Sequence, residues 1–259
     1  MIRLLHWNIL HGGGARRLPE ITLAILAHQP DVVLLSEFRT TTGGQIAGML
    51  ADRGLIHQHH TKPVPGSNGL LLASRFEWSI GDGPTPPGRL ASRWLDVALG
   101  PPADFWLTGV HVPDGHAPDP RAHFWQSMVE LSRARHEQPH LFLGDLNTGR
   151  HRLDEAGATF TCTSALGKVA TLGYSDAFRH FQPDGREATW SPPARRAFAG
   201  TTSANTSPPT LSNGFRLDSA LVSRPLLPRL RRAWYSHAER QSRISDHSVM
   251  LLEIDKSPA

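Results

Sequence analysis

The feature that most constrains the fold is a series of short apolar runs, each of strand length and each bounded by turn residues. Runs of this length between clusters of Gly, Pro, Asn and Asp are typical of buried β-strands. Several of them alternate with helical patterns, so we expect a mixed α/β architecture. The runs cover residues 2–7, 31–35, 70–73, 94–99, 105–110, 141–143, 217–222 and 249–254.

One helix is well marked in the sequence. Asp119 and Pro120 supply a cap and a first turn, and Phe124, Met128 and Leu131 then recur on one helical face. Weaker helical patterns cover residues 18–27, 44–52 and 164–172. The Pro, Gly and Ser content predicts loops over residues 81–88, 113–120 and 191–214. The last of these is longer than about 15 residues, and loops of this length in compact domains are usually either functional or disordered.

Length and composition exclude several classes of protein. The 259 residues show no composition shift that would mark a linker, so we expect one domain over residues 1–259. The single cysteine, Cys162, excludes an internal disulfide and a cysteine-based metal cluster. No run approaches the roughly 18 apolar residues of a membrane helix, and the first residues do not form a signal peptide. We therefore expect a cytoplasmic protein that makes no membrane contact.

The positive charge is carried almost entirely by arginine. Lys and Arg together number 27 against 23 acidic residues, and only three of the 27 are Lys. Arginine stays ionised and binds phosphate through two parallel hydrogen bonds, so the excess permits an anionic partner. Four arginine pairs lie in or beside predicted loops, where they would either neutralise backbone phosphates or form ordinary solvated surface: Arg16/Arg17, Arg150/Arg152, Arg195/Arg196 and Arg231/Arg232.

Polar side chains stand at the ends of the apolar runs, where a strand holds a residue rigidly at a sheet edge. Taken singly, each has an ordinary interpretation, since an Asp after a strand often forms a turn and a lone His is often structural. Their occurrence together and in this order favours a functional site. The set comprises Asn8, Glu37, His111, Asp145, Asn147, Asp246 and His247.

These motifs resemble those of the endonuclease/exonuclease/phosphatase superfamily, which includes exonuclease III-type apurinic endonucleases and pancreatic-type deoxyribonucleases. The resemblance covers essentially the whole chain and implies a four-layer α/β/β/α sandwich with two central mixed sheets. The segments that carry it are HWN at 6–8, DVVLLSE at 31–37, NGLLLASR at 68–75, GDLN at 144–147, NGFRLD at 213–218 and SDH at 245–247, with YSDAFR at 174–179 and ATW at 188–190 as lesser landmarks.

The resemblance implies metal-dependent hydrolysis of DNA phosphodiester bonds, by an endonuclease or an exonuclease, with DNA repair as one setting. Mg²⁺, or Mn²⁺ in its place, requires oxygen ligands and is usually held by one or two carboxylates beside the substrate phosphate. Glu37 is the expected first ligand, and Asn8, Asp145 and Asp246 are candidates to complete or border the site.

The resemblance also assigns catalytic roles. Asp145 would orient or deprotonate the attacking water with the support of Asn147. His247 would contact a phosphate oxygen or act as the base, with Asp218 fixing its tautomer. Which of Asp145 and His247 removes the proton is left open at this stage.

His111 departs from the exonuclease III pattern, which has a tyrosine at this point. A histidine here is similar to the deoxyribonuclease-like, deadenylase-like and phosphatase-like branches. It would protonate the leaving oxygen or bind phosphate, and its presence argues against a substrate restricted to abasic sites.

Substrate contacts are expected from Arg195 and Arg196 in the long loop, from Trp190 and from Arg216. Trp190 would stack on a base or fill an abasic gap, or else belong to the core. We expect DNA as the partner of a monomeric enzyme. The alternatives are a phosphatase or phosphodiesterase for a small-molecule or lipid phosphate, and a catalytically inactive binding module on the same fold.

Overall fold

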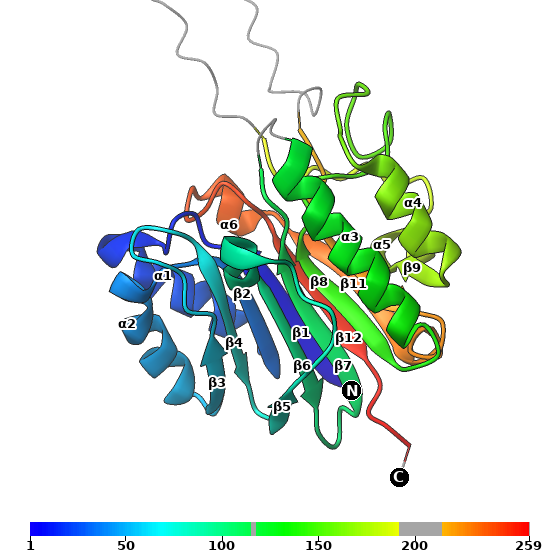
Figure 1. Ribbon diagram of the computed structural model, residues 1–259. Coiled ribbons are helices and arrows are strands. Elements are labelled where there is room, and N and C mark those ends of the chain that lie inside the picture. The colour runs from blue at the N-terminus through cyan, green and yellow to red at the C-terminus, as the bar shows by residue number, and fades with distance from the viewer. Residues whose placement is uncertain (115–117, 192–213, 259) are drawn as a thin grey trace, which may run out of the picture.

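Two six-stranded sheets lie face to face, and helices cover the outer face of each (Figure 1). The computed structural model describes all residues except 115–117, 192–213 and 259. Each sheet contains one parallel pair of strands in otherwise antiparallel order, so both are mixed. The predicted α/β/β/α sandwich is therefore confirmed.

The first sheet has the strand order β11-β12-β1-β2-β4-β3. Its strands are β1 (Ile2–Asn8), β2 (Val32–Phe38), β3 (His57–His60), β4 (Gly69–Ser74), β11 (Leu230–Ser236) and β12 (Val249–Ile254). The second sheet has the order β5-β6-β7-β8-β10-β9. Its strands are β5 (Trp78–Ile80), β6 (Trp94–Leu99), β7 (Phe105–His111), β8 (His140–Asp145), β9 (Tyr174–Asp176) and β10 (Asp218–Ser223).

Two pairs of helices form the outer layers (Figure 1). Helices α1 (Gly14–Ala27) and α2 (Thr40–Ala51) pack on the first sheet, and α3 (Pro118–Arg135) and α4 (Thr163–Thr171) pack on the second. Shorter helical segments are η1 (Gly88–Arg93), α5 (Ala177–Phe181), η3 (Leu227–Arg229) and α6 (Ala238–Gln241). Within the part of the chain that the structure describes, no helix is long and apolar enough to cross a membrane.

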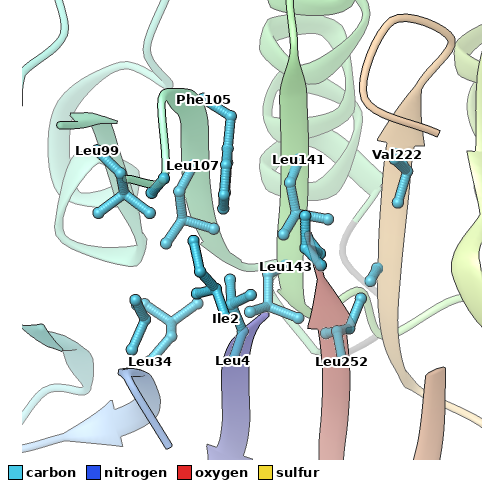
Figure 2. Close-up of a cluster of buried hydrophobic side chains, with 14 of the residues drawn as sticks. Ile2, Leu4, Leu34, Leu99, Phe105, Leu107, Leu141, Leu143, Val222 and Leu252 are labelled. Atoms are coloured by element: carbon cyan, nitrogen blue, oxygen red, sulfur yellow. The ribbon is translucent and has the colours of Figure 1, made fainter. Parts of the chain in front are cut away.

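The strand period of two divides the apolar side chains between two cores. Leu4 of β1 and Leu34 of β2 face the second sheet, where they meet side chains such as Leu143 of β8 (Figure 2). Leu5 and Trp7 of β1 point the other way and pack under α1 and α2. By the same alternation His6 and Asn8 continue the face that looks toward the second sheet, so β1 carries two polar groups into the space between the sheets.

All eight predicted apolar runs lie in strands, and the four predicted helical patterns lie in α1 to α4. Strands β3, β5, β9 and β11 were not predicted. The first three are short edge strands, and β11 carries two exposed arginines, so none shows a continuous apolar run. The predicted loop at 113–120 is shorter than expected because α3 begins at Pro118, and most of the predicted loop at 191–214 lies outside the described residues.

Candidate active site

The ends of the central strands of both sheets meet at one point. Asn8, at the end of β1, donates from Nδ2 to Asp145 Oδ2 of β8 at 3.1 Å and to Glu37 Oε1 of β2 at 3.4 Å. Asn8 and Asp145 are both almost completely buried. The structure therefore brings together three of the predicted site residues, drawn from two different sheets.

Glu37 reaches this point because β2 bulges where it passes β4. The pairing register shifts between Ser36 and Phe38, and Glu37 has a φ of 59°, in the left-handed region that a bulky residue rarely adopts. Its Oε2 accepts the backbone N–H of His11 at 2.7 Å and lies 2.8 Å from His11 Nδ1. A strained backbone conformation of this kind often occurs at functional sites.

Asp145 is placed by the close approach of β7 and β8. A Cβ on the preceding Gly144 would lie only 1.8 Å from the carbonyl oxygen of Val110, so only glycine fits there. Asp145 Oδ1 accepts the backbone N–H of Asn147 at 3.0 Å. Asn147 has a φ of 46°, and its side-chain amide donates to the carbonyl of Val112 at 2.8 Å. Asn147 thus braces the turn that carries Asp145.

Two imidazoles flank the Asp145 carboxylate. Nε2 of His247 and Nε2 of His111 each lie 3.9 Å from Asp145 Oδ2. On its other side His247 Nδ1 is 2.8 Å from Asp218 Oδ2, the first residue of β10. His111 Nε2 is also 3.4 Å from a guanidinium nitrogen of Arg93. The predicted Asp218–His247 pair is therefore formed, and both histidines reach Asp145.

The electrostatics of the cluster follow from burial and from two adjacent carboxylates. Burial and the charge of Asp218 raise the pKa of Asp145 to about 7. Burial alone would raise the pKa of Asp218 as well, but His247 keeps it below its ordinary value. Burial opposes protonation of His247, yet Asp218 raises its pKa to about 9. Burial and the positive charge of Arg93 hold the pKa of His111 well below 6.5.

Asp246 and Trp190 form a second group at the edge of the cluster. The indole Nε1 of Trp190 donates to Asp246 Oδ2 at 3.0 Å, and the Trp190 backbone pairs with Phe215 and His247. Ser245 Oγ donates to the carbonyl of Asn8 at 2.6 Å, which ties this segment to β1. Trp190 is only half-buried, and its indole orients the Asp246 carboxylate.

Arg216 does not reach the cluster. Its guanidinium is buried and pairs with Asp154 and Asp176, and it donates to the hydroxyl of Tyr235 at 3.2 Å. These internal partners give Arg216 a structural role, and its predicted substrate contact stays a prediction. Arg195 and Arg196 lie outside the described residues.

His6 is a buried neighbour of the site that the sequence reasoning did not select. Its Nδ1 lies 3.5 Å from Asp218 Oδ1, and its Nε2 is 3.2 Å from Ser36 Oγ. Burial lowers the pKa of His6 to about 4, so it is neutral at physiological pH. The sequence does indicate His6, because it lies two residues before Asn8 and therefore on the same face of the strand.

The donor atoms fit a hard divalent cation. Glu37 and Asp145 place carboxylate oxygens on either side of the Asn8 amide nitrogen, and carboxylate oxygens are the ligands that Mg²⁺ and Mn²⁺ prefer. Among the residues that the structure describes, one set of three acidic or imidazole ligand atoms lies within 4.8 Å: Asp145, Asp218 and His247. Asp218 Oδ1 is buried there without a hydrogen bond. A cation would offset the repulsion between the two buried carboxylates.

The fold and site together define an α/β sandwich with an acidic, histidine-flanked site between the ends of its two sheets. The model of the Endonuclease/Exonuclease/phosphatase family matches residues 5–247, and the chain belongs to this family. No curated protein matches the sequence significantly.

Solved structures share the fold at low sequence identity. An AP endonuclease from Archaeoglobus fulgidus is 18% identical with a TM-score of 0.80. A 3′-5′ exonuclease from Neisseria meningitidis is 19% identical with a TM-score of 0.76. A 3′ phosphatase from Neisseria, bound to a product DNA hairpin, is 19% identical with a TM-score of 0.75. In each comparison 98% of this chain and 100% of the other are covered.

Proposed function

We propose that this protein is a metal-dependent phosphodiesterase that hydrolyses DNA. The observation that carries the proposal is the buried Asp145 carboxylate, which is held by Asn8 and flanked by His247 and His111. A carboxylate in this position has the geometry to aim and deprotonate a water molecule. DNA as the substrate is supported by two of the similar structures, an AP endonuclease and a 3′ phosphatase bound to a product DNA hairpin.

In this proposal Asp145 accepts the proton of the attacking water. Its Oδ1 is fixed by the N–H of Asn147, so its orientation does not depend on substrate. His247 is held by Asp218 in a form that carries a proton, because the paired carboxylate stabilises the imidazolium. It therefore contacts a non-bridging phosphate oxygen as a cation, and the base is Asp145 rather than His247.

His111 contacts the phosphate as a neutral imidazole, beside the guanidinium of Arg93. Glu37 and Asp145 are the carboxylates that would hold Mg²⁺ or Mn²⁺, with the Asn8 amide between them, and Asp246 accepts a hydrogen bond from Trp190 at the edge of the cluster. A bound cation would polarise the phosphate and stabilise charge on the leaving oxygen.

A substrate panel tests the proposal. Purified protein is incubated with Mg²⁺ or with EDTA and offered abasic, nicked and single-stranded DNA, RNA, inositol phosphates and a generic phosphomonoester. We expect DNA cleavage in Mg²⁺, loss of cleavage in EDTA, and at least a 10²-fold lower rate for Asp145→Asn. Asp184→Asn, the same change at an exposed position, serves as the control and should retain the wild-type rate. Turnover of only the small phosphates would overturn DNA as substrate.

A further inference from the structure

A cavity of about 920 Å³ opens beside the site, between the edges of the two sheets. One wall is formed by residues 59–68, between the edge strand β3 and β4, and the other by the segment from Ile80 through η1 to Asp96. His59, which lines the cavity, packs edge-on against Trp78 of β5 with ring centroids 5.6 Å apart. The two sheet edges thus touch beside the cavity. Its volume is at the upper end of the range for ligand sites.

Each wall of the cavity has a residue that contacts the proposed catalytic centre or its immediate neighbours. On one wall Asn68 Nδ2 lies 3.3 Å from Nδ1 of His11, the residue that contacts Glu37. On the other wall Arg93 lies 3.4 Å from His111 Nε2. These two contacts place the cavity next to the cluster around Asp145.

The free charges of the cavity are mostly positive. Lys62, Arg89 and Arg93 line it. Of the two acidic side chains in the lining, Asp96 is committed to a bidentate pair with the buried Arg135, and Asp114 lies 4.0 Å from Arg93. Burial and the neighbouring charges of His60 and Lys62 lower the pKa of His59, which is consistent with a positive potential here.

Apolar side chains are exposed in the same lining. Val64 is 54% exposed and Ile80 is 56% exposed, and both lie in the cavity together with the half-buried Leu90. Val64 on one wall and Ile80 on the other thus offer apolar contact area to a ligand in the cavity. The ligand that matches this lining carries several negative charges and flat apolar faces.

We propose that this cavity holds unpaired nucleotides next to the scissile phosphate, so that the preferred substrate is a single DNA strand or a single-stranded end. Resting on the proposed function, this inference names the form of DNA that the site accepts. Arg89, Arg93 and Lys62 bind the backbone phosphates, and base faces pack on Val64 and the other apolar groups. In a duplex the base faces are stacked inside the helix and cannot reach such a lining, so pairing removes these contacts.

The test compares one labelled DNA sequence as a single strand, as a blunt duplex and as a duplex with a single-stranded overhang. Steady-state KM and kcat are measured for wild type, Val64→Asp and Arg89→Glu. Leu23→Asp introduces an aspartate in place of another exposed aliphatic side chain, and Arg53→Glu repeats the charge reversal; both positions lie outside the cavity and serve as controls. Anisotropy of the labelled strands in EDTA, on the Asp145→Asn background, reports binding separately from cleavage.

We expect the blunt duplex to be cleaved at least tenfold less efficiently than the single strand. Val64→Asp and Arg89→Glu each raise KM and Kd for the single strand at least tenfold, with kcat within about twofold, while both controls match wild type. Equal cleavage of duplex and single strand, or unchanged KM in both cavity variants, overturns the inference and leaves DNA hydrolysis standing. A larger effect of Val64→Asp on a small phosphomonoester than on DNA also overturns it. Absence of any DNA cleavage by wild type overturns the proposed function as well.

Discussion

Replacing Asp145 by asparagine is expected to stabilise the metal-free protein while it lowers the rate of hydrolysis at least 10²-fold. Burial and the charge of Asp218 raise the pKa of Asp145 from 3.8 to about 7 in the folded protein. The folded state then binds this proton more tightly than the unfolded chain does. The resulting stability is fully present below about pH 3.8 and is lost as the pH rises through about 7. A pKa difference of about 3 corresponds to about 4 kcal/mol.

Asparagine carries no charge and therefore avoids this loss at pH 8. Its oxygen can still accept the N–H of Asn147, but its NH₂ group faces the NH₂ group of Asn8, and the lost hydrogen bond costs about 1–2 kcal/mol. The net gain in the free energy of unfolding is about 2 kcal/mol. For a chain of this size that raises Tm by about 4–8 °C.

Thermal unfolding followed by circular dichroism in EDTA, at pH 8 and at lower pH, measures this gain. We expect Asp145→Asn to melt above wild type at pH 8 and the difference to shrink toward pH 4. Mg²⁺ should raise the Tm of wild type more than that of the variant, because a ligand that binds the folded state stabilises it by mass action. An equal or lower Tm for the variant at pH 8 would refute the argument that Asp145 and Asp218 repel each other in the folded protein.

Three further changes test other parts of the structure. Asp154→Asn removes the carboxylate that pairs with the buried Arg216, so urea unfolding should show a loss of about 3–5 kcal/mol, and a loss below 1 kcal/mol would contradict this role. Trp190→Phe removes the hydrogen bond to Asp246, and steady-state assays should show kcat/KM about tenfold lower with Tm nearly unchanged; unaltered kinetics would show that the bond does not matter. Burial holds the pKa of His140 well below 6.5 in the folded protein. As the pH falls below 6.5, His140 is therefore protonated in the unfolded chain but not in the folded protein, and the free energy of unfolding falls by about 1.4 kcal/mol per pH unit. Urea unfolding of His140→Gln between pH 7 and 5 should show a shallower slope than wild type, and identical slopes would contradict it.

Much of the fold was predictable because strand periodicity and length are local properties. The apolar runs locate the central strands, and the parallel pairing of β1 and β2 brings Asn8 and Glu37 to one edge, whereas Asp145 joins them only because the two sheets pack face to face. Edge strands such as β9 and β11 were not predicted, because each pairs with only one neighbouring strand and needs no continuous apolar run.

The partners of Arg216 and His111 were not predicted, since they come from segments distant in sequence. Arg216 stands next to the Asp218 strand and fits a substrate contact by position, but Asp154 and Asp176 fold against it and occupy its guanidinium. Arg93 and His111 are brought together across the β6–β7 pair, and nothing local to Arg93 indicates it. Sequence patterns place residues on elements, whereas contacts between elements depend on packing.

The most direct test of the central claim is the dependence of DNA cleavage on Mg²⁺ in wild type and Glu37→Gln. Initial rates on one labelled oligonucleotide are measured from EDTA through increasing Mg²⁺ concentrations. We predict no cleavage in EDTA, saturable cleavage by wild type, and at least a tenfold higher Mg²⁺ concentration for half-maximal cleavage by Glu37→Gln. Cleavage that persists in EDTA, or identical Mg²⁺ curves for the two proteins, would contradict a metal-dependent site built around Glu37.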